Sequence, residues 1–202
     1  MSSDFKTVII KDVTYQWPHL GKATYYSSHE GRSVECEPTH PGAAWSTQFD
    51  VSDAEMKRVE ELAKAHFADC KTRDSRIGNY ELIHGQKSVV LDDGTVANRL
   101  SAKRKTITAK GKQVKEPPVV DGRRMPLEDR NFWSGSRGNI KVTLMPTLNQ
   151  SKGQWGISML LDSLQVTDAH YGDAGEDFDI VDDKAANTNA VYDFDDEIPF
   201  GT

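Results

Sequence analysis

The chain lacks the sequence features that mark disulfide-rich, membrane-spanning and secreted proteins. Its 202 residues include two cysteines, Cys36 and Cys70, which lie far apart and form no Cys-x-x-Cys motif. A disulfide framework is therefore not expected, and a reducing compartment suits the chain. No apolar run approaches the roughly 20 residues that a membrane helix needs, and no basic-then-apolar signal pattern opens the sequence. We therefore expect a soluble, cytoplasmic protein with no membrane partner.

Motifs of the common catalytic sites are also missing. The sequence contains no glycine-rich phosphate loop, no nucleophile elbow and no His-Glu-x-x-His helix. Adjacent acids do not replace them, because Asp92 and Asp93 lie in a turn pattern and the acid pairs of the C-terminal tail have no rigid element to hold them. A two-metal nuclease needs such carboxylates around ions about 4 Å apart. We therefore expect that the protein is not an enzyme and needs no cofactor.

The cysteines and two histidines offer one candidate metal site. Cys36 and His40 are four residues apart, as are His66 and Cys70, and four such ligands can close a tetrahedral zinc site. However, His66 and Cys70 fall on the apolar face of a predicted helix, where core packing explains both. The spacings are not those of a familiar zinc module. We therefore expect no bound metal, with zinc as the alternative.

The net charge of −6 is unevenly distributed along the chain. Residues 173–202 carry ten acids and one base, a net −9, whereas residues 1–172 carry 24 bases and 21 acids, a net +3. Within the body, residues 99–141 hold twelve bases and four acids. This asymmetry is typical of nucleic-acid-binding proteins with an interaction tail. On charge alone, a solvated basic face with a solubilising tail is an equal alternative.

The first predicted element is a strand. Residues 7–17 mix β-branched and aromatic side chains, and Val13, Tyr15 and Trp17 alternate along the second half. Pro18 follows directly and is expected to interrupt this strand, because proline has no backbone N–H for a sheet ladder.

A second strand and a helix come next. Residues 43–51 alternate regularly between apolar and polar side chains. Ser52 and Glu55 then form a capping box, and the helical apolar period behind it runs to about Cys70. The Asp93-Gly94 pair predicts a later hairpin turn.

These patterns predict a mainly β protein with five or more strands and one helix between the early and late strands. An OB-fold five-stranded barrel suits this order, although other small barrels are not excluded. Residues 99–122 are interpreted as two strands around the Lys110–Lys112 turn, forming an extended basic hairpin. We assign residues 1–172 to the OB-fold domain and residues 173–202 to a disordered acidic tail.

Basic residues interleaved with aromatic residues form the candidate nucleic-acid site. Phosphates need cations, and each base stacked on an aromatic ring is worth roughly 1–3 kcal/mol. For any single aromatic residue, ordinary core packing is the alternative. The candidate DNA-binding residues are Lys103, Arg104, Lys105, Lys110, Lys112, Lys115, Arg123, Arg124, Arg137, Phe132, Trp133, Trp45 and Trp17.

The late segment resembles the bacteriophage single-stranded DNA-binding proteins. It has their Pro-Val-Val-Asp segment, their aromatic-aromatic-Ser-Gly opening, and their Lys-Gly turn followed by a strand that ends near Gln-Val. The matching residues are Pro118–Asp121, Phe132–Gly135, Lys152–Gly153, Gly156, Leu161 and Gln165–Val166. The resemblance implies an OB-fold, binding of single strands without sequence specificity, and roles in phage replication and recombination inside the host cell.

The C-terminal end resembles the acidic tip of bacterial single-stranded DNA-binding proteins, which ends in Asp-Asp-Asp-Ile-Pro-Phe. The matching residues are Asp195, Asp196, Glu197, Ile198, Pro199 and Phe200. In those proteins the tip docks on replication and repair enzymes, so the resemblance implies a protein-interaction tail. Here Gly201 and Thr202 follow the phenylalanine that ends the bacterial tip.

We therefore expect a phage protein that coats single-stranded DNA by phosphate neutralisation and base stacking. Its acidic tail is expected to recruit replication or recombination proteins and to compete for the DNA groove. One alternative is an interaction protein or DNA mimic acting on a host enzyme through the tail, and another is an RNA-binding OB protein. A homodimer is an open alternative to a monomer.

Overall fold

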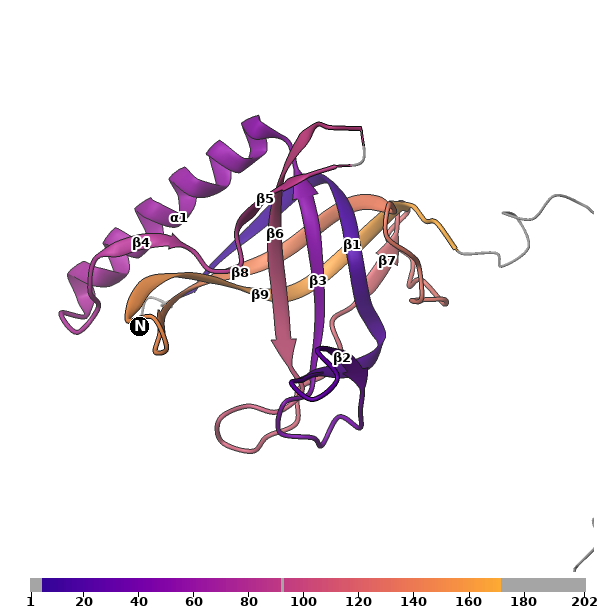
Figure 1. The fold of residues 1–202 in the computed structure, drawn as a ribbon, viewed down its shortest axis with the longest axis horizontal. Coiled ribbons are helices and arrows are strands. Elements are labelled where there is room, and N and C mark those ends of the chain that lie inside the picture. Colours follow the sequence, from indigo (N-terminus) through magenta and orange to yellow (C-terminus); the bar gives the residue numbers. More distant parts are fainter. Residues whose placement is uncertain (1–4, 92, 172–202) are drawn as a thin grey trace, which may run out of the picture. The chain divides into compact units, whose positions relative to one another are not determined.

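The computed structural model describes residues 5–91 and 93–171 (Figure 1). Predictions that concern the acidic tail, including its disorder and its Ile198–Phe200 tip, lie outside the described residues. Within the described residues, no helix combines the length and the apolar composition that crossing a membrane requires.

Five strands close into a barrel. Antiparallel pairing joins β1 to β3, β3 to β6, β1 to β8 and β8 to β9, and a short parallel contact between β6 and β9 completes the circle. This is the architecture of an OB-fold, and the predicted fold class is confirmed. The barrel strands are β1 (Lys6–Ser27), β3 (Ala44–Val51), β6 (Val96–Lys105), β8 (Arg137–Asn149) and β9 (Gln154–Asp168).

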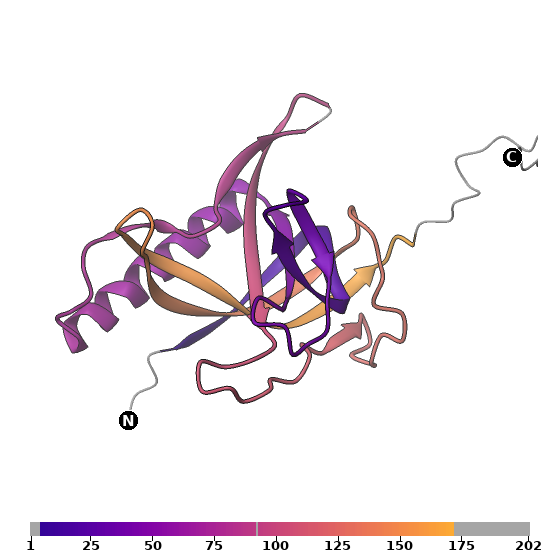
Figure 2. The ribbon, with the colours of Figure 1, turned by 60° about the horizontal axis from the view of Figure 1, so that its bottom comes forward.

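The remaining elements decorate this barrel. β2 (Arg32–Glu35) extends β1 as a ribbon, and β5 (Lys87–Val90) forms a hairpin with β6. That hairpin stands out from the barrel in both views (Figures 1 and 2). β4 (Tyr80–Ile83) and β7 (Val119–Asp121) pair with β9 in parallel.

The helix α1 (Asp53–Arg73) connects β3 to the β4–β6 region and packs on the barrel. The serine half of the predicted capping box is confirmed, because Ser52 Oγ accepts a hydrogen bond from the backbone N–H of Glu55 at 3.3 Å. The Glu55 carboxylate instead accepts from the Lys11 N–H at 3.1 Å and from Arg58 Nε at 2.8 Å. The helix continues to Arg73, one turn beyond the residue where the apolar period ended. Arg73 pairs with Asp69 at 2.9 Å, and a basic residue in the last turn complements the helix dipole.

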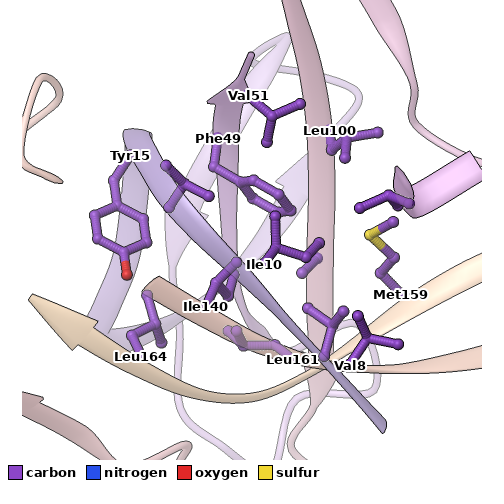
Figure 3. Packing of buried hydrophobic residues seen from close by; sticks show 14 of the residues in the cluster. Val8, Ile10, Tyr15, Phe49, Val51, Leu100, Ile140, Met159, Leu161 and Leu164 are labelled. Atoms are coloured by element: carbon purple, nitrogen blue, oxygen red, sulfur yellow. The ribbon is translucent and has the colours of Figure 1, made fainter. Parts of the chain in front are cut away.

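Alternating side chains of the barrel strands fill the core, as Figure 3 shows for residues such as Ile10, Phe49, Leu100, Ile140 and Leu161. Their side chains are removed from water, which is the main favourable contribution to folding. The apolar face of residues 43–51 is the inner face of β3, as its alternation predicts.

The predicted basic hairpin is only partly formed. Ile107 and Gln113 make a single bridge around the Lys110–Lys112 turn. The described residues directly after this turn form no strand that pairs with β6. Instead, β7 pairs with β9. Two consecutive prolines precede β7, and proline cannot donate to a ladder, so the chain leaves β6 as a loop.

Candidate nucleic-acid interface

The outer surface of β1, β3 and β6, which we call the outer face, corresponds to the strand surface and neighbouring loops through which OB-folds bind oligonucleotides. Residues paired across neighbouring strands place their side chains on the same side of a sheet. The register therefore produces three rows on the outer face: Arg137–Thr14–Asp50–Arg99, Gln16–Gln48–Ser101 and His19–Ser46–Lys103. The face is polar, and its acid, Asp50, is flanked by an arginine on the next strand.

A β-bulge interrupts β1 at the middle of this face. Gln16 pairs with Gln48 and His19 pairs with Ser46, so two residues of β1 oppose one residue of β3. The two residues at the bulge are Trp17 and Pro18, so the pairing of β1 is interrupted where the sequence predicted an interruption, while the strand continues beyond it. Bulges bend a strand and redirect a side chain.

The redirected side chain is that of Trp17. By alternation, Trp17 would follow Val13 and Tyr15 into the core, yet it is 52% exposed. Its backbone has a φ of 45°, an uncommon conformation for a bulky residue. The backbone N–H donates a hydrogen bond to Ser134 Oγ at 2.9 Å, which ties the bulge to the segment before β8. The backbone that carries the exposed ring is therefore held by a tertiary contact.

Arg99 lies against the Trp17 ring, with its Cζ 4.9 Å from the ring centroid. Because β3 separates β1 from β6, the ring reaches across the outer face. Arg99 donates to Asp50 through Nε at 2.6 Å and through Nη2 at 2.8 Å. Hydrogen bonding to Asp50 raises the pKa of Arg99 above its ordinary value. The cation beneath Trp17 is thus buried, fixed and neutralised.

Trp133 is the second exposed tryptophan, at 58% exposure. It opens a turn in which Gly135 has a φ of 94° and donates its backbone N–H to Tyr15 O at 2.9 Å. The backbone N–H of Trp133 donates to His170 O at 2.7 Å. The same turn contains Ser134, so one short segment positions both tryptophans.

The two tryptophans line one hollow of about 360 Å³, which we call the tryptophan hollow. Its polar lining includes His19, Lys22 and Asn131. Partial burial lowers the pKa of His19, a shift that the nearby charge of Glu35 only partly opposes. His19 is therefore largely neutral at pH 7, and the hollow presents ring faces and hydrogen-bonding groups rather than a concentrated charge.

A second hollow, of about 520 Å³, is also lined by Trp17. We call it the hairpin hollow because Val89, Val90 and Leu91 of the β5–β6 hairpin line it together with Trp17 and Arg99. Val90 is exposed and apolar. Trp17 is thus a lining residue of both hollows.

The predicted basic residues lie in three places. Lys103 and Arg137 belong to the outer-face rows, and Lys105 continues the outward alternation of β6. Lys110, Lys112 and Lys115 are exposed on the loop after β6, and Arg123 and Arg124 are exposed on the turn after β7. Within residues 5–91 and 93–171, none of these cations forms an ion pair.

Arg104 differs from its predicted role. Its Nη1 donates to Leu161 O at 3.3 Å and lies 3.8 Å from Asp162 Oδ1. It is therefore held against β9 and is half-buried, because it alternates with the outward-facing lysines on either side of it.

Two of the predicted aromatic contacts are corrected by burial. Trp45 and Phe132 are each 2% exposed, and neither ring offers a free face to a base. Trp45 lies on the inward side of β3, and Phe132 packs against Tyr15 with ring centroids 5.6 Å apart. For these two residues, core packing is the correct interpretation.

Three of the four candidate zinc ligands make contacts that need no metal. His66 and Cys70 lie one turn apart on the buried side of α1, with Cys70 Sγ 3.6 Å from His66 Nε2. His40 stacks on Tyr25, with ring centroids 4.2 Å apart, and accepts a hydrogen bond from the Gly42 N–H. Among the described residues, no three His, Cys, Asp or Glu side chains gather as a metal site requires.

Sequence reasoning missed Asp50, Arg99, His19, Lys22 and Asn131 as parts of this surface. Arg99 is the first residue of the basic stretch 99–141, and this was the one feature of the sequence that could have placed it in the interface. The others carry no motif: pairing between strands places Asp50 and His19, and Asn131 comes from the loop before β8.

Comparison with known proteins places the fold among solved structures. No protein-family model and no curated protein matches the chain. The single-stranded DNA-binding protein of bacteriophage Enc34, solved in complex with ssDNA, is 17% identical, with 80% of this chain and 86% of that chain covered and a TM-score of 0.53. Another structure of the Enc34 protein is 13% identical, with 88% and 89% covered and a TM-score of 0.52. At these identities, the likeness shows that this chain shares the fold of the phage single-stranded DNA-binding proteins.

Proposed function

We propose that this protein binds single-stranded DNA on its outer face without sequence specificity. The observation that carries the proposal is the exposure of Trp17 and Trp133 on one hollow of an OB-fold strand surface. Large exposed aromatic rings are costly in water, and bases stack on them regardless of sequence. The Enc34 protein, which shares the fold, is described in complex with ssDNA, and this supports the assignment.

In the proposed complex, bases stack on Trp17 and Trp133 while cations contact the phosphates. Lys103, Lys105 and Arg137 lie on the same face as the rings. The cations of the loop after β6 and of the turn after β7 extend the basic surface. Each phosphate that a cation neutralises releases counterions, so binding weakens as salt rises.

We further propose roles in phage DNA replication and recombination, with residues 173–202 as a protein-interaction tail. Those residues carry a net −9. A tethered acidic segment competes with DNA for a basic surface at a millimolar-scale effective concentration. The same segment can recruit replication or recombination proteins, since the Ile198–Phe200 tip resembles a known docking tip.

The test is a competition titration. A labelled oligo(dT) is bound to the full-length protein, and unlabelled single-stranded DNA, duplex DNA and single-stranded RNA are added separately over a salt series. We expect single-stranded DNA to compete best and the affinity to fall steeply with salt. Equal competition by duplex, or a flat salt response, contradicts the proposal. Better competition by RNA supports the RNA-binding alternative.

A further inference from the structure

Asp50 is an acidic side chain at the centre of a face that we propose binds a polyanion. Its pairing partners on the outer face are Thr14 and Arg99, and its side chain is 11% exposed. Simple electrostatics makes an acid in this position unfavourable for DNA binding, since it repels phosphates. The contacts of Asp50 explain its place there.

Both carboxylate oxygens of Asp50 are engaged. Oδ1 accepts from Arg99 Nε at 2.6 Å, and Oδ2 accepts from Arg99 Nη2 at 2.8 Å and from Gln16 Nε2 at 3.0 Å. Two parallel hydrogen bonds fix a planar guanidinium in orientation as well as in position. Gln16, in turn, is the residue before Trp17 and pairs with β3 at the edge of the bulge.

The fixed guanidinium lies against one face of the Trp17 ring, at 4.9 Å from its centroid. A cation at this distance is attracted to an indole face, and Arg is well suited to such stacking. The face of the ring against Arg99 is therefore occupied, which leaves the opposite face for a ligand. The ring is half-exposed, and its contact with Arg99 restricts it before any ligand arrives.

We infer that Asp50 is a positioning residue for the base-stacking platform: it orients Arg99, Arg99 supports Trp17, and Trp17 offers its one open face to one nucleobase. The inference rests on the proposed function. Asp50 then favours DNA binding although it is negatively charged. Arg99 cancels its charge, and the two hydrogen bonds from Arg99 to Asp50 orient the guanidinium that supports the Trp17 ring. Arg99, being neutralised, contributes no phosphate contact.

The decisive experiment is the substitution Asp50→Asn in the full-length protein. It removes a negative charge from the DNA-binding face, so charge alone predicts tighter binding. We expect instead that affinity for oligo(dT) falls by about tenfold, since the stacking of one base is weakened, while the slope of log affinity against log salt stays unchanged. The matched control is Asp69→Asn, the same substitution at an acid of α1 that also pairs with an arginine, Arg73, at 2.9 Å. Asp69 lies outside the outer face and both hollows, so its substitution is expected to leave affinity unchanged.

A double-mutant cycle with Trp17→Ala isolates the role of Asp50. If Asp50 acts through Trp17, Asp50→Asn has little further effect on affinity in the Trp17→Ala background. Equal effects of Asp50→Asn in both backgrounds, or tighter binding by Asp50→Asn, overturn the inference. If Trp17→Ala itself leaves affinity unchanged, the proposed DNA site is wrong. The cycle therefore distinguishes failure of the DNA site from failure of the positioning role of Asp50.

Folding is controlled separately, because Asp50→Asn leaves a buried arginine without its counterion. The double variant Asp50→Asn with Arg99→Gln removes both charges together and is expected to show the same loss of affinity. In each variant, the indole Nε1–H resonance of Trp17 in the DNA-free protein is expected to shift. A Trp17 resonance that stays unchanged in a folded Asp50→Asn variant contradicts the positioning role.

Discussion

The outer face and the basic segment of residues 106–125 present different chemistry to a ligand. At its centre the outer face offers the ring of Trp17, and the nearest cation, Arg99, is paired with Asp50. The segment 106–125 contains no aromatic residue, but its exposed lysines and arginines form no ion pair with another described residue. In the proposed complex, base stacking therefore comes from the outer face, whereas the segment 106–125 adds cations but no rings. The rings and this segment can each be changed without the other.

The largest effect is expected from removing the rings. The double variant Trp17→Ala with Trp133→Ala loses about 1–3 kcal/mol of binding free energy for each stacked base, while the salt slope is retained. Anisotropy of a labelled oligo(dT) at several salt concentrations measures both quantities. Ile9→Ala is a matched control, because Ile9 is 53% exposed on the same strand and lines neither hollow. A reduced slope with unchanged affinity would contradict the separation of the two regions.

A smaller and different effect is expected from the basic segment. Replacing Lys110 and Lys112 by glutamine reduces the magnitude of the salt slope by about 0.7 for each phosphate that is no longer neutralised. Quenching of tryptophan fluorescence at saturating DNA is expected to stay as in the parent protein, because the rings are untouched. Glutamine at Lys57 and Lys64, on the exposed side of α1, makes the same charge change away from the outer face. An equal change of slope in that control contradicts a specific role of the segment.

Deleting residues 173–202 tests whether the acidic segment opposes the basic one. We expect affinity for oligo(dT) to rise several-fold at low salt and to converge with the full-length value as salt increases, since charge interactions are screened. The increase should shrink when Lys110 and Lys112 are already glutamine. Equal affinity of the full-length and shortened chains at every salt concentration shows that these residues do not occupy the groove.

The smallest effect on binding is expected at Trp45, which carries the same ring as Trp17 but is buried. Trp45→Phe is expected to lower the free energy of unfolding by about 1–3 kcal/mol, because it removes packed volume from the core. Trp17→Ala, at an exposed position, is expected to change stability by about 0.5 kcal/mol or less. Denaturant titrations measure both values. If the folded Trp45→Phe variant binds DNA more weakly, Trp45 contributes to DNA binding and its interpretation as a core residue alone is wrong.

The helix and the inner side of β3 could be predicted from the sequence because their signals are local. A capping serine, a helical period and a regular alternation of apolar residues each depend on neighbours within a few positions. The predicted second strand of the basic hairpin was wrong for a non-local reason. After a short turn in which the Val114 N–H donates to Thr106 O at 2.7 Å, the chain does not continue along β6, and β7 pairs instead with β9.

The candidate site was predictable in composition but not in geometry. The basic stretch and the aromatic residues were visible in the sequence, yet nothing local distinguishes Trp17, which is exposed, from Trp45, which is buried. By alternation both belong to apolar faces. The backbone N–H of Trp17 donates to the hydroxyl of Ser134, which is 117 positions away in the chain, and this bond anchors the bulge.

The sequence by itself determined the unequal charge of body and tail, the helix with its cap, and the alternating strands that build an OB barrel. These features follow from the order of side chains along the backbone. The tertiary structure alone decided which rings meet solvent and which cations are neutralised. A bulge exists only relative to its partner strand, and the Asp50–Arg99 pair exists only because β3 and β6 align in one register.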